Sequence, residues 1–231
     1  MEEGILFIVT IISGAFAFNF LKTEAKKTVK ILLSFSGAFL LSTCILHIVP
    51  TIYSQSTDFT QTGVFILLGF LLQIFLEFFS GGSEHGHIHS HGKGLPLGII
   101  ISLSIHAFWE GAPFGFEHDH QHHLLAGIIM HKIPVAMVIG FFLKKSESDK
   151  FKSYAILGLF AIMPVLGAFL LDISETGDYL FVPTLAIVLG MMLHISTTIL
   201  FEASENHKFN AIKIVSIILG FAISIVSYTL I

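Results

Sequence analysis

The 231-residue sequence contains no arginine, a single cysteine and few charged residues. Asp, Glu, Lys and Arg together make up 12% of it, whereas a soluble globular domain carries about 25%. This low charge, together with 54% hydrophobic residues, excludes an ordinary soluble domain and indicates a protein that crosses a membrane several times. The lone cysteine, Cys44, excludes an intramolecular disulfide framework and a cluster of thiolate zinc ligands.

Eight apolar stretches are each long enough to cross a bilayer, which takes roughly 20 mostly apolar residues. No segment is left over for a soluble domain, so we expect one all-α transmembrane domain over residues 1–231. The expected spans are about 4–21, 30–50, 62–80, 95–116, 124–143, 152–171, 180–201 and 211–231. The connection at residues 81–94 is longer than the others and rich in histidine.

The lysines support this span count. All of them except Lys132 fall in or beside the 1–2, 3–4, 5–6 and 7–8 connections, and none falls in the other connections or at the two ends. Because lysine-rich connections face the cytoplasm, we expect both termini on the outer side. The pattern predicts a multi-pass protein of a cell membrane, either a plasma membrane or a bacterial inner membrane, surrounded by lipid bilayer.

Spans 2 and 7 share a weak sequence similarity. With one gap, GAFLLSTCIL from Gly37 and GMMLHISTTIL from Gly190 have glycine, leucine, Ser-Thr and Ile-Leu in common. Because these spans cross the membrane in opposite directions, the similarity favours two inverted three-span units flanking spans 4 and 5, as transporter repeats often are. Chance similarity between two apolar helices is the alternative to this 3+2+3 arrangement.

Four ionisable residues lie near the middle of spans 4 and 5, namely His106, Glu110, His131 and Lys132. Ionisable groups at membrane depth are costly and mark functional sites. His106 and Glu110 are four residues apart and therefore share one helix face. Two imidazoles and a carboxylate are ligands that zinc or a similar divalent ion takes. We therefore predict a metal site formed by His106, Glu110 and His131, on neighbouring antiparallel helices.

Prolines and glycines flank the predicted ligands. Pro113 and Pro134 each leave the carbonyl four residues earlier without its helical partner, and such carbonyls are costly in lipid unless they face a wet cavity or a cation. Gly111 and Gly115 form a face of small residues, which predicts that this span packs closely on another helix.

These residues resemble motifs of the ZIP (Zrt/Irt-like) metal-ion transporters. HAFWEG at residues 106–111 resembles the fourth-helix motif, and His131-Lys132 resembles the fifth-helix motif in the branch that has His-Lys there. GAFLLSTCILHIVP at residues 37–50 resembles the second-helix pattern. The resemblance implies uptake of Zn2+ toward the cytoplasm, with Cd2+, Fe2+ and Mn2+ as alternative cargoes, and it places His106, Glu110 and His131 at the family's ligand positions.

The chain departs from the fullest family pattern at three positions. Val135 stands where many members have a second carboxylate, and Ala107 stands where many have Asn or Asp beside the helix-4 histidine. Lys132 stands where many members have Asn, Asp or Glu that helps to hold a second ion. An ammonium there would repel a second dication and can pair with Glu110, so we expect one metal ion, with Lys132 substituting for the second site. A lysine that snorkels to the membrane surface is the alternative.

Other residues are weaker candidates for metal binding or for the path of the ion. Four histidines alternate in the connection expected to be cytoplasmic, a composition weakly associated with metal binding: His85, His87, His89 and His91. Four more lie in the outer 4–5 connection, where they could gather cations: His118, His120, His122 and His123. A solvated linker is the alternative for the first group, and a solvated turn is the alternative for the second. Three residues within spans could line the path: His47, His194 and Glu77. A hydrogen bond to a neighbouring helix is the alternative for His194.

A zinc-dependent hydrolase within the membrane is the alternative function. Such an enzyme would use similar ligands, but it also needs an activated water and a general base. The sequence contains no His-Glu-x-x-His motif, and Glu110 cannot easily act as both ligand and base, so we expect no enzymatic activity. An efflux carrier or a metal sensor is a third alternative. No nucleic-acid partner is expected, and a homodimer stays open.

Overall fold

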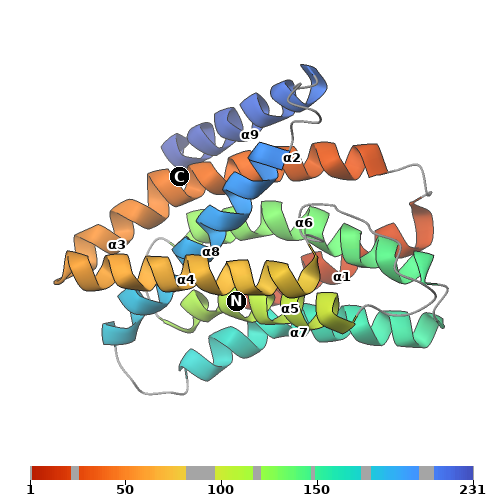
Figure 1. Cartoon of the computed structure of the whole chain (residues 1–231), viewed down its shortest axis with the longest axis horizontal. Coiled ribbons are helices and arrows are strands. Elements are labelled where there is room, and N and C mark those ends of the chain that lie inside the picture. Colours follow the sequence, from red (N-terminus) through yellow and green to blue (C-terminus); the bar gives the residue numbers. More distant parts are fainter. Residues whose placement is uncertain are drawn as a thin grey trace.

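The computed structural model describes residues 2–21, 26–81, 97–116, 121–146, 149–172, 178–202 and 211–230. Within these residues the protein consists of helices and contains no strand. Eight helical stretches in them are long and apolar enough to cross a membrane, which confirms the predicted all-α polytopic class. Most helices run side by side along one axis of the molecule, while α8 crosses them at a steeper angle (Figure 1).

The first three spans are formed by five helical segments. They are α1 (Glu2–Phe20), α2 (Lys26–Thr43), the π-helix η2 (Cys44–Ile48), α3 (Val49–Gln55) and α4 (Phe59–Ser80). The middle three make up span 2, which ends at Gln55 rather than near residue 50. Asp58 begins α4, because its carboxylate accepts hydrogen bonds from the backbone N–H groups of Thr60 and Gln61 at 2.9 and 3.0 Å. Gly81 ends α4 with a φ of 60°, a conformation that glycine adopts without strain.

The other five spans are formed by five α-helices, the first of which continues into a 3-10 turn. They are α5 (Leu97–Gly111) with the 3-10 turn η4 (Ala112–Gly115), α6 (Gln121–Lys145), α7 (Lys150–Asp172), α8 (Phe181–Glu202) and α9 (Ala211–Leu230). A short 3-10 turn, η5 (Asp178–Leu180), leads into α8. The predicted histidine-rich connection at 81–94 lies, apart from Gly81, outside the described residues.

Hydrogen bonds join three helix ends at one end of the bundle. Lys144, in the last turn of α6, donates from Nζ to the carbonyl oxygens of Asn19 and Leu21 at 3.3 and 2.8 Å. The amide of Asn19 in turn donates to the hydroxyl of Tyr154 in α7 at 2.7 Å. The 1–2 and 5–6 connections therefore lie on the same side, as the lysine pattern requires. That this end faces the cytoplasm stays a prediction.

The most closely packed helix pairs follow an internal symmetry. α4 packs on α8 and α2 on α9, while α1 packs on α6 and α5 on α7. Spans 1, 2 and 3 can be exchanged with spans 6, 7 and 8 respectively, and span 4 with span 5. The α4–α8 pair then becomes the α9–α2 pair, and the α1–α6 pair becomes the α7–α5 pair. Spans five steps apart cross the membrane in opposite directions. Two inverted three-span units flanking spans 4 and 5 would produce this pairing.

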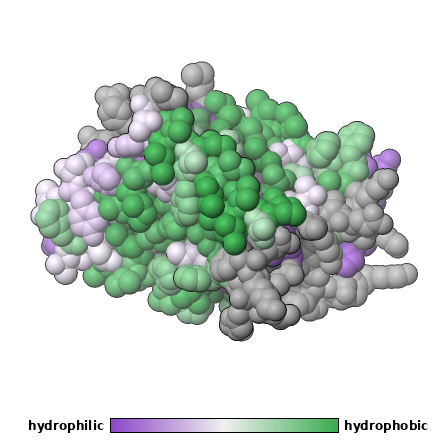
Figure 2. Space-filling model, turned by 90° about the horizontal axis from the view of Figure 1, so that it is seen from above, coloured by the Kyte–Doolittle hydropathy of each residue, from purple (hydrophilic) through white to green (hydrophobic). Residues whose placement is uncertain are grey.

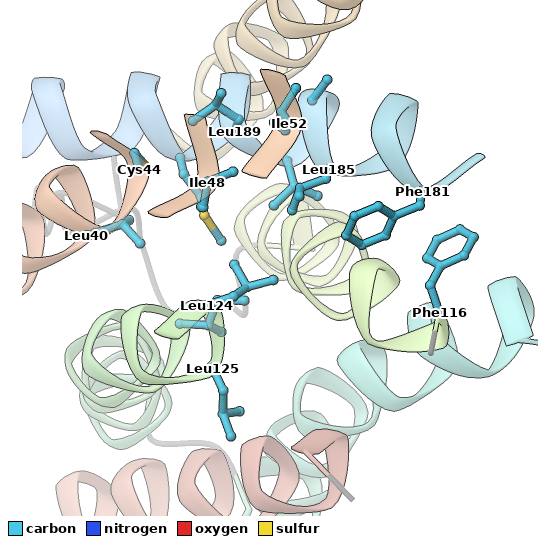
Figure 3. Packing of buried hydrophobic residues seen from close by; sticks show 14 of the residues in the cluster. Leu40, Cys44, Ile48, Ile52, Phe116, Leu124, Leu125, Phe181, Leu185 and Leu189 are labelled. Atoms are coloured by element: carbon cyan, nitrogen blue, oxygen red, sulfur yellow. The ribbon is translucent and has the colours of Figure 1, made fainter. Parts of the chain in front are cut away.

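The surface and the interior differ in the way expected of a membrane protein. Large apolar side chains such as Leu67, Phe75 and Phe78 of α4 are exposed, and Figure 2 shows a broad hydrophobic area on one face of the molecule. Inside, a hydrophobic cluster lies where span 2 meets α6 and α8 (Figure 3). In this cluster the rings of Phe116 and Phe181 lie edge to face, with centroids 5.6 Å apart. The cluster holds span 2 against α6 and α8.

Candidate metal centre

α5 carries His106 and Glu110 on its buried face. Their side chains are 1% and 2% exposed, whereas Ile101 and Ile105 of the same helix are exposed. One helical turn separates the two polar residues, and Nε2 of His106 lies 3.1 Å from Oε1 of Glu110. The four-residue spacing in an apolar span therefore places an imidazole nitrogen beside a carboxylate oxygen inside the bundle.

α6 brings His131 and Lys132 to the same place. Both residues are 1% exposed, and they lie near the middle of a helix that continues through Pro134 without ending. The ring of His131 meets the ring of His106 edge to face, with centroids 5.9 Å apart and an interplanar angle of 82°. The two imidazoles therefore approach each other from different spans.

The three predicted ligands form one compact group. His106, Glu110 and His131 can each offer a ligand atom such that these atoms all lie within 4.8 Å of one another. Zinc binds nitrogen and oxygen ligands at about 2.0–2.2 Å, so ligand atoms around one ion lie closer together than this. Small side-chain rotations would bring the three atoms onto a shared ion. Among the residues that the structure describes, these three form the one group of at least three His, Cys, Asp or Glu side chains whose ligand atoms lie this close together.

The two carboxylate oxygens of Glu110 have different neighbours. Oε1 faces His106, and Oε2 accepts a hydrogen bond from Nζ of Lys132. The ammonium of Lys132 also lies over the ring of Phe160 in α7, 4.7 Å from its centroid, where a cation is attracted to the ring face. Lys132 is thus held inside the bundle, and the snorkelling alternative is wrong.

Gln73 of α4 contacts the other nitrogen of the His106 ring. Its Oε1 lies 3.1 Å from Nδ1 of His106, and its side chain is fully buried. In the tautomer with the ring proton on Nδ1, His106 donates to this oxygen and Nε2 keeps the lone pair that a metal ion takes. The sequence alone did not predict this contact. A lone amide in an apolar span was the available signal, but it does not reveal which neighbour the amide meets.

The predicted small-residue face joins α5 to α7. A Cβ atom at Gly111 would overlap the carbonyl oxygen of Pro164, and one at Gly115 would overlap that of Ala168. The close approach of backbones predicted for this face is therefore confirmed. At Pro113 the α-helix has already given way to the tighter turn η4, because a proline cannot donate the next helical hydrogen bond.

α5 and α6 face each other across their polar side chains rather than through close backbone packing. α5 packs mainly on α7 and α4, whereas α6 packs mainly on α1 and α2. The contacts of Lys132 with Glu110 and of His131 with His106 confirm that spans 4 and 5 are neighbours. Their backbones, however, pack mainly on other helices.

His194 and Glu77 form a separate polar pair between α8 and α4. Nε2 of His194 lies 3.3 Å from Oε2 of Glu77, and its Nδ1 lies 3.4 Å from Oγ1 of Thr198. The ring also packs on Phe70, with centroids 4.9 Å apart. These contacts agree with a structural hydrogen bond to a neighbouring helix, and a place on the path of the ion stays a prediction for both residues.

Only some of the other candidate histidines lie within the residues that the structure describes. His47 lies in η2, and the centroid of its ring is 5.0 Å from that of His123 near the start of α6. His122 is exposed. Six others fall outside the residues that the structure describes: His85, His87, His89, His91, His118 and His120.

Comparison with known proteins gives a partial match. No protein-family model matches the chain. The protein described as zinc transporter YKE4 of Saccharomyces cerevisiae is 40% identical to it over 77 residues. The match covers 29% of this chain and 22% of the yeast protein, so the chain spans about a fifth of the length of the curated relative that it matches. Its similarity to a zinc transporter is therefore confined to one segment.

Proposed function

We propose that the chain is a transporter of divalent metal ions, mainly zinc, which moves the ion toward the cytoplasm of the cell. The observation that carries this proposal is the burial of two imidazoles and a carboxylate within 4.8 Å of one another, on helices that span the membrane. The partial similarity to a zinc transporter and the resemblance of HAFWEG and His131-Lys132 to ZIP motifs support the same function.

His106, Glu110 and His131 would bind the transported ion directly. Nε2 of His106 and Oε1 of Glu110 already lie 3.1 Å apart, and a nitrogen of His131 would supply the third ligand. Water would complete the shell, because three protein ligands leave at least one position open on a tetrahedral ion. An incomplete protein shell suits transport, since an ion must be bound strongly enough to enter and weakly enough to leave.

Lys132 would restrict the site to a single ion. Its ammonium bonds to Oε2 of Glu110, the carboxylate oxygen that a second ion would otherwise share. A second dication beside this buried positive charge would be repelled in a medium of low dielectric constant. In this arrangement Oε1 would bind the ion while Oε2 stays bonded to the ammonium of Lys132. The carboxylate of Glu110 would therefore have a counter-charge both when the ion is bound and when it is absent.

The charge pattern supports an orientation of the protein, and the ZIP resemblance supports a direction of transport. The lysines beside the 5–6 connection lie at the same end of the bundle as the end of α1, and lysine-rich ends face the cytoplasm. In a cell membrane, uptake of the kind that the resemblance implies would bring the ion in from the opposite end and release it on the lysine side. Nothing observed in the described residues specifically favours the alternative zinc hydrolase.

Flux measured on purified protein in liposomes tests this proposal. We expect saturable uptake of zinc by the wild-type protein, lost in both His106→Ala and Glu110→Ala and retained in Gln61→Ala, which alters an exposed residue of α4. The same assay with cadmium, iron and manganese ranks the cargoes. Metal bound by the wild-type protein without any flux would contradict the proposal and favour a hydrolase or a sensor.

A further inference from the structure

The start of α6 and the π-helix of span 2 bring two histidines together away from the metal centre. The ring centroids of His47 and His123 are 5.0 Å apart with an interplanar angle of 59°, and the ring of Tyr228 from α9 lies 5.1 Å from that of His123. We propose that His47 and His123 form a second binding site for a divalent cation, which joins span 2 to α6.

The spacing of the two rings is the one that a shared ion requires. An imidazole nitrogen binds zinc at about 2.0–2.1 Å in a tetrahedral shell, which puts the centres of two such rings roughly 5 Å apart. The observed 5.0 Å separation matches this value.

The pocket beside the pair is small and has both apolar and polar walls. It lies between span 2, α6 and α9, with Phe39, Leu46 and Ala126 among its lining residues, together with His47, His123, Thr43, Ser224, Ser227 and Tyr228. The last four carry hydroxyl groups, which can hold the water molecules that complete the shell of an ion bound by two imidazoles. A pocket lined by apolar groups alone would offer no such support.

The backbone is unusual at this position. His47 belongs to η2, a single turn of π-helix inside an otherwise α-helical span. Turns of this kind are rare and are frequently found at functional sites. The irregular turn and the histidine pair therefore coincide within one span.

This second site is distinct from the metal centre. His123 precedes His131 by eight residues on α6, which is about 12 Å along the helix axis. Leu124, Leu125 and Ile128 lie between them on α6 and belong to the buried hydrophobic cluster. One ion cannot contact both places, so the second site would be filled independently and does not depend on the proposed transport function.

Metal binding to full-length protein with a disabled metal centre tests the inference. In a His106→Gln/His131→Gln background, titration with zinc and with cobalt should show a bound ion whose Kd weakens by about tenfold or more when His47→Gln or His123→Gln is added. Cobalt reports its ligands through its visible absorption, which should change in both variants. Gln61→Leu, at an exposed position of α4 outside this pocket, serves as the control and should leave Kd and absorption unchanged.

Several outcomes would overturn the inference. An unchanged Kd in both His47→Gln and His123→Gln would do so, as would an equal loss in Gln61→Leu. The unfolding temperature without metal shows whether each variant is folded, and Tyr228→Phe, which keeps the ring and removes the hydroxyl, provides a further variant with a weaker effect. These results do not rely on flux, so failure of the transport proposal in liposomes remains a separate result.

Discussion

Lys132 on α6 and Glu110 on α5 form an ion pair in the middle of the bundle, with side chains only 1% and 2% exposed. Two opposite charges removed from water cost several kcal/mol each, and only their mutual attraction and further hydrogen bonds offset this. Oε1 of Glu110 faces His106, and the ammonium of Lys132 lies over Phe160. Each partner therefore makes the burial of the other tolerable.

Removing one partner of this pair should destabilise the protein strongly. Glu110→Gln leaves the ammonium of Lys132 buried without its counter-charge, which costs about 3–5 kcal/mol in comparable buried pairs. The double variant Glu110→Gln/Lys132→Met removes both charges and should recover much of that loss. Thermal or denaturant unfolding in detergent measures the effect. Equal stability of the single and the double variant would contradict the interpretation.

The number of ions held by the metal centre should be one. If Lys132 excludes a second ion, His106→Ala should bind one equivalent of zinc fewer than the wild-type protein. Counting the difference between the two proteins removes the contribution of histidines elsewhere in the chain. Metal analysis after dialysis gives the count, and a loss of two equivalents in His106→Ala would contradict a single-ion centre.

The features that were predictable from the sequence depend on local composition. The lipid interior forces every span to be a continuous helix, so hydropathy and lysine placement predict eight spans. His106, Glu110 and His131 stood out because ionisable residues are rare at membrane depth. Their assembly into one group also needs the helices to face one another, which the similar depth of the residues suggested.

The features that were not predictable depend on how the helices are rotated and spaced. Gln73 lies in an apolar span whose lipid-facing side looks much like its buried side, so its contact with His106 could not be inferred. That α5 packs mainly on α7 and α4, and α6 mainly on α1 and α2, likewise could not be inferred from the sequence. The π-helical turn that holds His47 has no recognisable sequence signal.

Gln73 should support metal binding without contacting the ion. Gln73→Leu keeps a similar volume but removes the oxygen that accepts from Nδ1 of His106, so the ring loses its fixed orientation. Loss of such a partner typically weakens metal affinity about 10–100-fold. Isothermal titration with zinc measures the change, and Gln61→Leu, at an exposed position of the same helix, is the control. The same Kd in Gln73→Leu and the wild-type protein would show that this contact does not orient the ligand.

Close packing at Gly111 should be essential for positioning the metal centre. A Cβ atom there would overlap the backbone of Pro164 in α7, and Gly111 directly follows Glu110. Gly111→Ala should therefore push α5 away from α7 and destabilise the protein by about 1–3 kcal/mol, as overpacking does, while zinc affinity falls as well. Gly158→Ala in α7, where a Cβ atom meets nothing within 4 Å, should have no such effect, because alanine favours the helix more than glycine. Unfolding and zinc titration of the two variants give the comparison, and equal stability of both would show that α5 can move away from α7 without cost.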